Sequence, residues 1–425
     1  MTELVKSPMI DDSPHPTSAT GVGYKPFDHD FAQNPYAFYA IACRDAPVCY
    51  NPLYNVWLVM GHDEVVTVVR DPILFSSADT LTYPFQLPEQ VEAIMKEGFH
   101  PMPAGLFNND PPGHTRARAL AMTAFTPARV TSMEQPIRAL AHSLVDAFVK
   151  DGHADLMSQF AYPLPMTVIA DLIGLPRKDM AQVKAWHDDW LALYAPDVPL
   201  EKQLSCARSL VSYQHYYAAL IEDRRVNPRD DLTTALVQSR LEGTKSFTTA
   251  EMVSQLILLL SAGHETTTNL IGTMLRLLLE NPEQWRALGE NPSLATAAID
   301  ESLRFEAPVQ MEARTATAPA ELGGVMIPKG ARLHVYYGSA NRDSAAFEDP
   351  DRFDIHRSKP QRHLAFGHGI HFCIGAVLAR LEARIALEVL RERLPNLRLA
   401  PGFAVEYAPS LFFRQPNRIE IVWDS

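Results

Sequence analysis

A mostly helical protein with a small β-rich region, an α+β fold, is the fold class that the sequence predicts. Capped stretches of helical length follow one another from about residue 112 to residue 306. Short β-like segments gather beyond residue 307. No internal repeat and no low-complexity linker divides the chain. We therefore expect one continuous domain over residues 31–425, preceded by a lead-in over residues 1–30.

The first elements combine helices and strands. The lead-in is polar and rich in proline, and we expect it to be largely irregular. An amphipathic helix is predicted over 35–46, followed by strands over 47–51 and 54–61. A capped helix is predicted over 62–71.

A long connection follows from residue 72 to residue 112. It shows no sustained periodicity beyond a possible short helix at 88–97. A connection of this length in a compact protein is usually functional or disordered. Six large apolar side chains argue against disorder here: Leu81, Tyr83, Phe85, Leu87, Phe99 and Phe107.

The central and C-terminal parts differ in their periodicity. Several central helices open with recognisable signals, namely TPARV, PRKDM, FTTAEM and NPEQW. The longest central helix is predicted over about 249–280 and would be roughly 48 Å long. Beyond residue 307, the β-like segments ARTATA, ARLHVYYGSA, AVEYA and NRIEIVWD surround a last long helix over 374–394.

The composition excludes some classes of protein. The chain has 425 residues, 47% of them hydrophobic, which is enough for a large core. Its net charge of −12 disfavours nonspecific nucleic-acid binding, which depends on Lys and Arg neutralising phosphates. Four scattered cysteines are too few for a disulfide framework, which favours a reducing compartment.

The sequence predicts a cytoplasmic protein without a membrane segment. The stretch MTELVKSPMIDDSPHPTSATG at the N-terminus has no apolar run resembling a signal peptide. The most apolar helical stretch is interrupted by His264 and Glu265, which makes it a poor membrane span.

One cysteine lies between a glycine-rich loop and the last helix, in the stretch HLAFGHGIHFCIG. Gly367 and Gly369 permit a tight turn with positive φ and let backbone approach a ligand closely. The periodic segment starts directly after Cys373, so its sulfur would lie at a helix N-terminus, where backbone N–H groups favour the thiolate. Such a thiolate can ligate a soft metal centre. Phe366 and Phe372 would supply a dry, flat-sided wall.

Two other interpretations of this cysteine stay open on the residues alone. A free cysteine after an ordinary glycine turn usually behaves as a small hydrophobe. Three histidines of the same stretch, with Cys373, could ligate zinc, although His-x-x-His-x-Cys is not a usual closed zinc spacing. The three are His363, His368 and His371.

The stretch SAGHETTTN lies inside the long central helix, whose N-terminal half is apolar nearly all round and therefore buried. Ala262 and Gly263 leave a low spot against which a flat ligand could lie, and a local opening of the helix could hold a small molecule or water. Glu265 beside Thr266 could relay protons in a dry site. Alternatively, the Thr266 hydroxyl bonds the carbonyl four residues earlier and Glu265 forms a salt bridge.

Two further pairs lie at helical spacing. Glu301 and Arg304 are three residues apart and could form an ordinary surface ion pair. His114 and Arg118 share one helix face and could grip an anionic ligand, although solvated surface charge is the commoner explanation.

Together, in this order, these motifs resemble the cytochrome P-450 superfamily of haem-thiolate monooxygenases, specifically the soluble bacterial type. FGHGIHFCIG is similar to its haem-binding loop, and AGHETT to its oxygen-activation segment. ESLR and PDRF are similar to the two parts of its buried ion-paired cluster, and NDPPGHTRARAL to its propionate-binding helix. The likeness spans about residues 30–425. It implies the cytochrome P-450 fold, a triangular prism with a long central helix, formed by a single catalytic domain over 31–425.

The resemblance also implies a role for each matching residue. Cys373 would be the axial thiolate ligand of haem b, and Thr266 and Glu265 would deliver protons to bound dioxygen, the co-substrate. Glu301, Arg304 and Arg352 would form the structural cluster. Many relatives carry Arg at the position of His371, so the histidine of this chain would bind the propionate more weakly. The residues expected to bind the cofactor are His114, Arg118, Ala262, Arg314, Phe366, His371 and Gly375.

The implied reaction inserts one oxygen atom of O₂ into a small-to-medium hydrophobic substrate, by hydroxylation or oxidative demethylation. No flavin, nicotinamide or iron–sulfur motif is visible, so we expect electrons from a separate ferredoxin or flavodoxin with an NAD(P)H-dependent reductase. Two late segments resemble haem domains of a self-sufficient class with a fused reductase, yet the chain ends with this domain. Arg116, Arg380 and Arg384 could offer positive charge to an acidic partner, or could simply be solvated.

The substrate pocket is expected between the long connection, the central helix, the segment after ESLR and a C-terminal turn. Two other functions remain open: a haem-thiolate peroxygenase or isomerase, which the Glu265–Thr266 pair disfavours, and a non-catalytic haem- or zinc-binding sensor. The expected pocket residues are Leu81, Phe85, Phe99, Leu259, Ala262, Val309, Gln310, Leu411 and Phe412.

Overall fold

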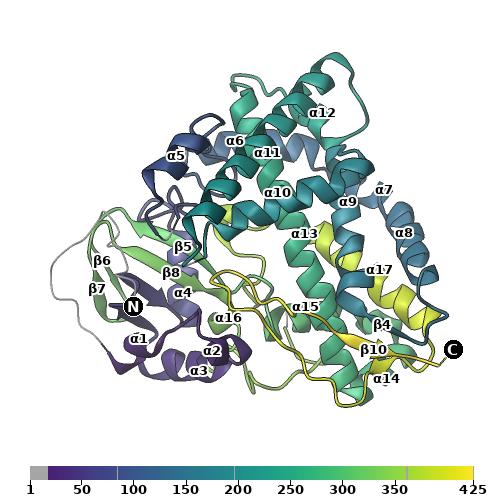
Figure 1. Ribbon diagram of the computed structural model, residues 1–425. Coiled ribbons are helices and arrows are strands. Elements are labelled where there is room, and N and C mark those ends of the chain that lie inside the picture. Colours follow the sequence, from purple (N-terminus) through teal and green to yellow (C-terminus); the bar gives the residue numbers. More distant parts are fainter. Residues whose placement is uncertain (1–17, 84, 196, 360–361, 425) are drawn as a thin grey trace.

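A large helical region and a smaller β-rich region make up the molecule (Figure 1). The computed structural model describes residues 18–83, 85–195, 197–359 and 362–424. The β-rich region combines N-terminal segments with segments from beyond residue 307, whereas the helical region holds most of the residues between them. The predicted α+β fold class is therefore confirmed.

The five helices whose bounds were predicted agree with the structure within two residues at each end. The α-helices are α1 (Ala19–Gly23), α2 (His29–Gln33), α3 (Tyr36–Asp45), α4 (His62–Arg70), α5 (Glu89–Met95), α6 (Gly113–Ala124), α7 (Pro127–Ser132), α8 (Glu134–Asp146), α9 (Pro163–Ile173), α10 (Met180–Ala192), α11 (Leu200–Val226), α12 (Leu232–Gln238), α13 (Thr249–Glu280), α14 (Pro282–Glu290), α15 (Ala295–Phe305), α16 (Tyr337–Ala340) and α17 (Ala376–Arg393). Shorter helical turns are the π-type η1 (Met157–Ala161) and the 3₁₀-type η2 (Arg177–Asp179), η3 (Pro292–Leu294) and η5 (Gly369–His371).

Three small sheets contain the strands of the described chain. The strands are β1 (Val48–Asn51), β2 (Val56–Val59), β3 (Phe75–Ser76), β4 (His153–Asp155), β5 (Met311–Ala316), β6 (Ala320–Leu322), β7 (Val325–Ile327), β8 (Arg332–Tyr336), β9 (Arg398–Leu399) and β10 (Glu420–Val422). The five-stranded sheet has the order β1-β2-β8-β5-β3, and only its β2–β8 pair is parallel. Trp57 opposite Leu333 sets the register of that pair. The sheet therefore joins the N-terminal hairpin to the segment that carries Arg314.

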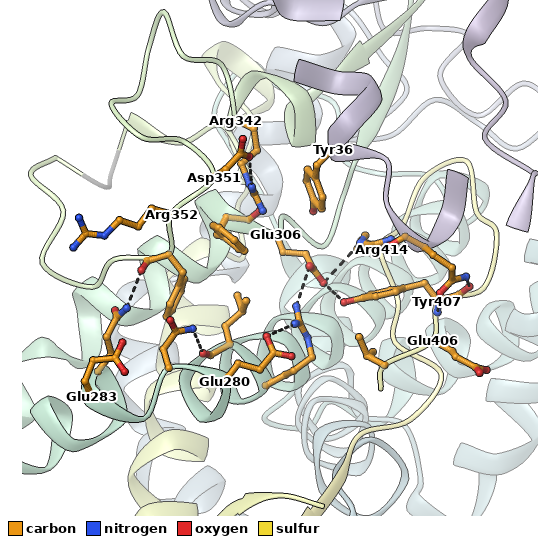
Figure 2. A pocket seen from close by; sticks show the side chains of 18 of the residues that line it. Tyr36, Glu280, Glu283, Glu306, Arg342, Asp351, Arg352, Glu406, Tyr407 and Arg414 are labelled. Carbon is orange, nitrogen blue, oxygen red and sulfur yellow. Dashed lines mark hydrogen bonds and ion pairs between the residues drawn. The ribbon is translucent and has the colours of Figure 1, made fainter. Parts of the chain in front are cut away.

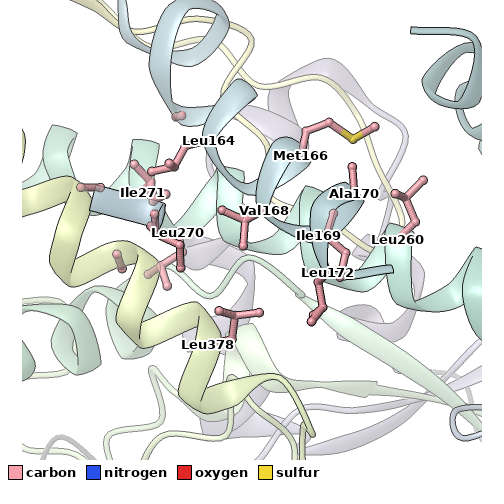
Figure 3. Close-up of a cluster of buried hydrophobic side chains, with 14 of the residues drawn as sticks. Leu164, Met166, Val168, Ile169, Ala170, Leu172, Leu260, Leu270, Ile271 and Leu378 are labelled. Carbon is pink, nitrogen blue, oxygen red and sulfur yellow. The ribbon is translucent and has the colours of Figure 1, made fainter. Parts of the chain in front are cut away.

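Helix α13 runs down the middle of the helical region, with α9 and α17 packed against it (Figure 1). A capping box of Thr248 and Glu251 starts it, which satisfies backbone donors at its first turn. Figure 3 shows apolar side chains of α9, α13 and α17 meeting in the core between these helices, among them Ile169, Leu270 and Leu378. Each such side chain stabilises the fold by about 1.5–3 kcal/mol on burial.

The expected irregular lead-in is wrong for the residues that the structure describes in it. Ser18 caps α1, and α2 begins at His29, still within the lead-in. Tyr24 is fully buried, stacks edge-on against Phe31, and shares a short hydrogen bond with the hydroxyl of Tyr336. Aromatic residues spaced among the polar ones supply this burial, and the average composition of the segment hides them. Residues 1–17 lie outside the described part.

The expected strand over 404–408 is also wrong. Only one isolated bridge, between Tyr407 and Pro416, forms there. Proline lacks the N–H that a second ladder bond would need. Tyr407 instead donates its hydroxyl to Glu306, at 2.6 Å.

The long apolar helices do not have the character of membrane spans. Among the described residues, every helix is either too short or insufficiently apolar to cross a bilayer.

Candidate functional site

The glycine-rich loop before Cys373 is held in a tight turn. Gly367 and Gly369 each have φ +69°, which confirms the predicted positive φ at both positions. A Cβ at Gly369 would lie 2.7 Å from the carbonyl oxygen of Val69, so only glycine fits against α4 there. The backbone N–H of Cys373 donates to the Phe366 carbonyl at 2.9 Å, which closes the loop.

The cysteine is half-buried, and its environment acts on its pKa in both directions. Burial raises the pKa of the Cys373 thiol, whereas the backbone N–H of Gly375 and the Arg118 and Arg380 guanidiniums lower it. Helix α17 begins at Ala376, two residues later than predicted, with Gly375 as its N-cap. The helix start therefore contributes one hydrogen bond to the sulfur. A cation bound to the sulfur would be needed to overcome the rise in thiol pKa that burial causes.

The two phenylalanines of the loop have different surroundings. Phe366 packs against the core and has the Arg380 guanidinium 4.4 Å above its ring. Phe372 is 44% exposed, so the expectation that it forms part of a dry wall is wrong. Of the two rings, only that of Phe366 can shield the loop from solvent.

Four of the residues expected to bind the cofactor, those matched to its carboxylates, lie together beside Cys373. They are His114, Arg118, Arg314 and His371. The rings of His114 and His371 lie 4.3 Å apart, and the Nε2 atom of each is buried with no hydrogen-bond partner in the described chain. The charges of Arg118 and Arg314 act on these imidazoles: the pKa of His114 is lowered by burial and by Arg118, and that of His371 falls to about 3 through burial and Arg314.

These unsatisfied groups fit an anionic ligand. Buried polar atoms are almost always hydrogen-bonded, so two orphaned imidazole nitrogens at one place indicate a missing acceptor or donor. Arg118 forms no hydrogen bond or ion pair with any residue that the structure describes, and the Cys373 thiol acts on its pKa electrostatically. A flat molecule carrying carboxylates, ligated by the sulfur and contacted by these side chains, would satisfy all of them. Haem has that shape and those groups.

Arg314 is held in place by partners that the sequence did not reveal. It donates to the Glu312 carboxylate at 3.0 Å, and the Tyr337 hydroxyl donates to the same group at 2.8 Å. His371 donates from Nδ1 to the Leu106 carbonyl at 3.1 Å, so its Nε2 carries a proton only in the charged imidazolium. A carboxylate beside Nε2 would favour that form.

The buried ion-paired cluster contains Arg357 where we expected Arg352. Glu301 and Arg304 are fully buried and bond at 2.8 Å, which rules out the surface ion pair. Arg357 adds a second guanidinium, with Nε 3.2 Å from both Glu301 oxygens. The Arg352 side chain is 69% exposed and pairs weakly with Asp354 at 3.6 Å. Its backbone carbonyl alone joins the cluster, as an acceptor from Arg304.

The acid and the alcohol of α13 lie on different sides of an unbroken helix. Thr266 donates to the Ala262 carbonyl at 2.6 Å, which is the local bond that the sequence left open, and the helix shows no local opening. Ala262 is exposed on this side, whereas Gly263 faces α9, where a Cβ would lie 3.0 Å from Ile169. The low spot expected for a flat ligand therefore consists of Ala262 alone.

Glu265 is buried beside groups that the sequence analysis missed. Its Oε1 lies 4.0 Å from Lys184 Nζ, 4.0 Å from His187 Nε2 and 3.4 Å from His264 Nδ1. Burial raises the pKa of Glu265 to about 7, and Lys184 opposes that rise. The i, i+3 spacing of Lys184 and His187 indicated a shared face of α10, but not which helix that face meets.

Two of the expected pocket residues pack against the N-terminal region. Gln310 is buried, donates to the Ala307 carbonyl at 2.7 Å and accepts from the Tyr39 hydroxyl at 3.1 Å. Leu411 packs in the same N-terminal aromatic cluster, and both line a small cavity of about 30 Å³. They stabilise the packing of the N-terminal region, and their contact with the substrate stays a prediction.

Apart from the exposed Ala262, the remaining expected pocket residues are all half-buried. Leu81, Phe99, Leu259, Val309 and Phe412 are half-buried, which leaves part of each side chain free. Phe85 is also half-buried, and its ring lies 6.4 Å from Phe27 of the N-terminal segment.

Two tyrosines join the long connection over residues 72–112 to the residues just after α10 and to the C-terminal turn. The sequence did not indicate this pair. The rings of Tyr83 and Tyr194 lie 4.6 Å apart, and Tyr194 donates to the Leu81 carbonyl at 2.8 Å. Phe412 stacks edge-on against Tyr194, with the ring centres 5.9 Å apart. Two of the segments that we expected to enclose the substrate, the long connection and the C-terminal turn, therefore meet through Tyr194, which was not among the expected pocket residues.

The zinc alternative for the loop histidines is not supported. His363 lies 3.5 Å from Asp300, and His368 accepts from Arg70 at 2.9 Å, so the rings turn to separate partners. Within the described residues, His363, His368, His371 and Cys373 do not form a group of three converging ligand atoms.

The arginines expected to attract an acidic partner each have an acidic partner within the chain. Arg116 pairs with Glu251, and Arg380 bonds Asp300 at 2.9 Å. Arg384 bonds Glu134 and Glu388, both at 2.9 Å. These pairs leave less positive charge on that face than the sequence suggested.

A separate polar crevice of about 920 Å³ opens near the C-terminal end of α13 (Figure 2). Glu306 at its wall accepts from Tyr407 at 2.6 Å and from Arg276 at 3.0 Å, while Arg342 donates to Asp351 at 2.6 Å. These bonds tie the C-terminal loop to α13 and α15. The crevice shares no lining residue with the Cys373 region.

Comparisons with known proteins agree on one family. The family model described as Cytochrome P450 matches residues 200–394. Cytochrome P450 107B1 of Saccharopolyspora erythraea is 40% identical, covering 88% of this chain and 91% of that protein. Cytochrome P450 monooxygenase PikC of Streptomyces venezuelae is 39% identical, covering 93% and 92%. The solved structure of cytochrome P450 CREJ in complex with (4-ethylphenyl) dihydrogen phosphate matches with a TM-score of 0.89 and 37% identity, covering 95% of this chain and all of that one.

Proposed function

Because the chain belongs to the cytochrome P450 family of monooxygenases, we propose that it inserts one atom of dioxygen into a small-to-medium hydrophobic substrate, by hydroxylation or oxidative demethylation. The observation that carries this proposal is the convergence of two orphaned imidazoles and an unpaired guanidinium beside the Cys373 thiol. Buried polar groups are almost always hydrogen-bonded, so this convergence favours a ligand at this place.

The ligand that these residues would hold is haem b. The Cys373 sulfur would bind its iron, and His114, Arg118, Arg314 and His371 would bind its propionates. Phe366, Gly375 and the exposed Ala262 of α13 would contact the ring. Bound haem supplies the redox chemistry that activates dioxygen, with the thiolate as an electron-donating ligand.

The protein would supply protons through Glu265 and Thr266. Glu265 is buried next to Thr266 in sequence, and a carboxyl with a pKa of about 7 can hold and release a proton at neutral pH. The Thr266 hydroxyl donates to the Ala262 carbonyl and so keeps its oxygen lone pairs free to accept a hydrogen bond on the exposed side of α13. This division of roles places the acid in the interior and the alcohol at the reaction side.

The substrate and partner follow from the surfaces around this site. The half-buried apolar side chains of Leu81, Phe99, Leu259 and Phe412 favour a hydrophobic substrate over a charged one. A ferredoxin or flavodoxin with an NAD(P)H-dependent reductase would supply electrons. Because Arg116, Arg380 and Arg384 are already paired, docking would depend on shape and on exchange of these ion pairs. A cytoplasmic location remains a prediction.

Isotope labelling tests the reaction type. Hydrophobic compounds that shift the Soret band would be incubated with the haem-loaded protein, a surrogate ferredoxin, its reductase and NADPH under ¹⁸O₂. We expect a hydroxylated product to carry one ¹⁸O atom, and a demethylation to leave that atom in the formaldehyde released. A hydroxylated product without the label, or product formed equally well from peroxide without electron supply, would contradict a monooxygenase.

A further inference from the structure

Three buried side chains with ligand atoms meet where α10 packs against α13. They are His187 of α10 and His264 and Glu265 of α13, and this trio is distant in sequence from the Cys373 loop. His264 Nδ1 lies 3.4 Å and His187 Nε2 lies 4.0 Å from Glu265 Oε1. One ligand atom of each residue lies within 4.8 Å of the other two.

The imidazoles of the trio lack hydrogen-bond partners. Both side chains are 0% exposed, and both ring nitrogens of each find no partner in the described chain. Native interiors rarely leave four polar atoms unsatisfied at one place. An edge-on contact with Tyr162, 4.9 Å from His264, and one with Trp190, 5.7 Å from His187, hold the rings in orientation. These contacts hold the rings with one nitrogen of each within 4.8 Å of the other and of the Glu265 carboxylate.

The donor set identifies the class of ligand. Two imidazole nitrogens and one carboxylate oxygen form the set that holds Zn²⁺ with an open fourth position for water, whereas Mg²⁺ and Ca²⁺ prefer oxygen ligands. Zinc–nitrogen bonds of about 2.0–2.1 Å place tetrahedral donors about 3.3 Å apart. The 3.4 Å pair already meets this spacing, and small side-chain rotations would bring in the third ligand.

The charges next to the trio provide an entry route. Lys184 Nζ lies 4.0 Å from Glu265 Oε1 and pairs with Asp188 one turn along α10. The Lys184 side chain is 23% exposed and that of Asp188 is 52% exposed, so this pair lies between the trio and solvent. An incoming cation would replace the ammonium at the carboxylate, and Asp188 would offset part of the added charge.

We propose that His187, His264 and Glu265 form a zinc-binding site whose occupancy inhibits the enzyme. This inhibition rests on the proposed function, because Glu265 is the proposed proton donor. A carboxylate oxygen bound to Zn²⁺ is no longer free to hold and release a proton. Removing the zinc with a chelator restores the carboxyl group, so the inhibition is reversible.

Zinc titration of the haem-loaded enzyme tests the site. ZnCl₂ would be added to protein in metal-free buffer, with binding followed by calorimetry and by metal analysis after dialysis, and with MgCl₂ as the comparison ion. We expect one zinc per chain and no bound magnesium. His187→Ala should weaken zinc binding at least about tenfold. His142→Ala, which removes a histidine of α8 near Arg393, should leave it unchanged.

X-ray absorption at the zinc edge keeps the test independent of whether a variant folds. The unmodified enzyme should show two imidazoles and oxygen ligands. No bound zinc, zinc without imidazole ligands, or equal affinity in the His187→Ala and His142→Ala proteins would overturn the site.

The inhibitory part is measured separately. Product formed per electron consumed should fall on adding zinc and recover with chelator, each protein being compared with its own zinc-free rate. The His187→Ala protein should resist this fall. Zinc bound at the trio with turnover unchanged would overturn the inhibition and the role of Glu265. Failure of the proposed function would show instead as a missing thiolate–haem spectrum, while zinc binding persisted.

Discussion

Burial governs the charge state of the key side chains in this molecule. It raises the pKa of both Glu265 and the Cys373 thiol, and it lowers that of His371. Each of these groups therefore needs a specific neighbour to reach its charged form. The neighbours that the structure provides for them are Lys184, the Gly375 amide and the Leu106 carbonyl, respectively.

Removing the Thr266 hydroxyl should uncouple electron use from product formation. Thr266→Ala leaves the residues around Cys373 untouched, so haem binding should stay intact. Without the hydroxyl, proton delivery fails, and electrons should appear as hydrogen peroxide instead of product. Peroxide and product would be measured per NADPH consumed, with Thr266→Ser as the matched control that keeps the hydroxyl. Unchanged coupling in Thr266→Ala would remove this residue from the mechanism.

A second buried acid makes stability depend on pH. Glu382 of α17 is 2% exposed, its Oε2 has no hydrogen-bond partner in the described chain, and burial raises its pKa well above the usual value. Below the unfolded pKa of about 4.3, the carboxyl is protonated in both states and has no effect. As pH rises above that value, only the unfolded state ionises, so the free energy of unfolding falls by about 1.4 kcal/mol per pH unit until the folded pKa is reached.

Glu382→Gln should remove this fall, because an amide does not ionise. Denaturant unfolding of both proteins across the range from about pH 4 to pH 8 would measure it. The two should be similar at the acid end, and the variant should become progressively the more stable as pH rises. Parallel pH profiles would contradict the assignment of a neutral, buried carboxyl.

Single residues were predictable where local backbone rules decide, and less so where the fold decides. The positive φ of Gly367 and Gly369 follows from local turn chemistry, and both predictions are confirmed. The choice of Arg352 over Arg357 was wrong because, in an irregular segment, spacing does not determine which side chain turns inward.

At the scale of elements, two close contacts depend on a glycine. A Cβ at Gly369 of the loop before α17 would meet the Val69 carbonyl oxygen, and one at Gly263 of α13 would meet the Ile169 side chain of α9. Helix positions were predictable because 3.6-residue periodicity and caps are local signals. The trio of His187, His264 and Glu265 was not, since it arises only when two helices distant in the chain meet.

Gly369→Ala should damage the loop more than its backbone angle alone explains. A Cβ there meets the Val69 carbonyl oxygen at 2.7 Å, in addition to the strain of positive φ. Gly402→Ala is the matched control, with φ +75° and nothing within 4 Å of the added Cβ. We expect Gly402→Ala to cost about 1 kcal/mol and Gly369→Ala clearly more, together with a lower haem content. Equal unfolding free energies and equal haem content would show that the close contact does not matter.

At the scale of the whole molecule, buried charge networks join segments that are distant in sequence. Glu301 and Arg304 of α15 bind the segment that carries Arg357. Glu306, one residue after α15, joins α13 to the C-terminal loop through Arg276 and Tyr407, and Figure 2 shows its bond to Tyr407. The fold class was predictable from periodicity, whereas these networks depend on how loops are placed in three dimensions.

Arg357→Ala should destabilise the protein much more than Arg352→Ala. Removing Arg357 leaves the fully buried Glu301 with one guanidinium fewer, which we expect to cost about 3 kcal/mol or more. The exposed Arg352 side chain should contribute within about 0.5 kcal/mol. Chemical denaturation of the two variants measures both values. A larger loss of unfolding free energy in Arg352→Ala would contradict this and favour the cluster with Arg352 that we expected from the sequence.

The absorption spectrum of the reduced protein under carbon monoxide tests the central claim most directly. If Cys373 ligates haem iron through a thiolate, the unmodified protein should show a strongly red-shifted Soret band. Cys206→Ala, which removes another buried free cysteine, should keep that band, and Cys373→Ala should lose it. A colourless unmodified protein, or a band that persists in Cys373→Ala, would contradict the assignment of this site.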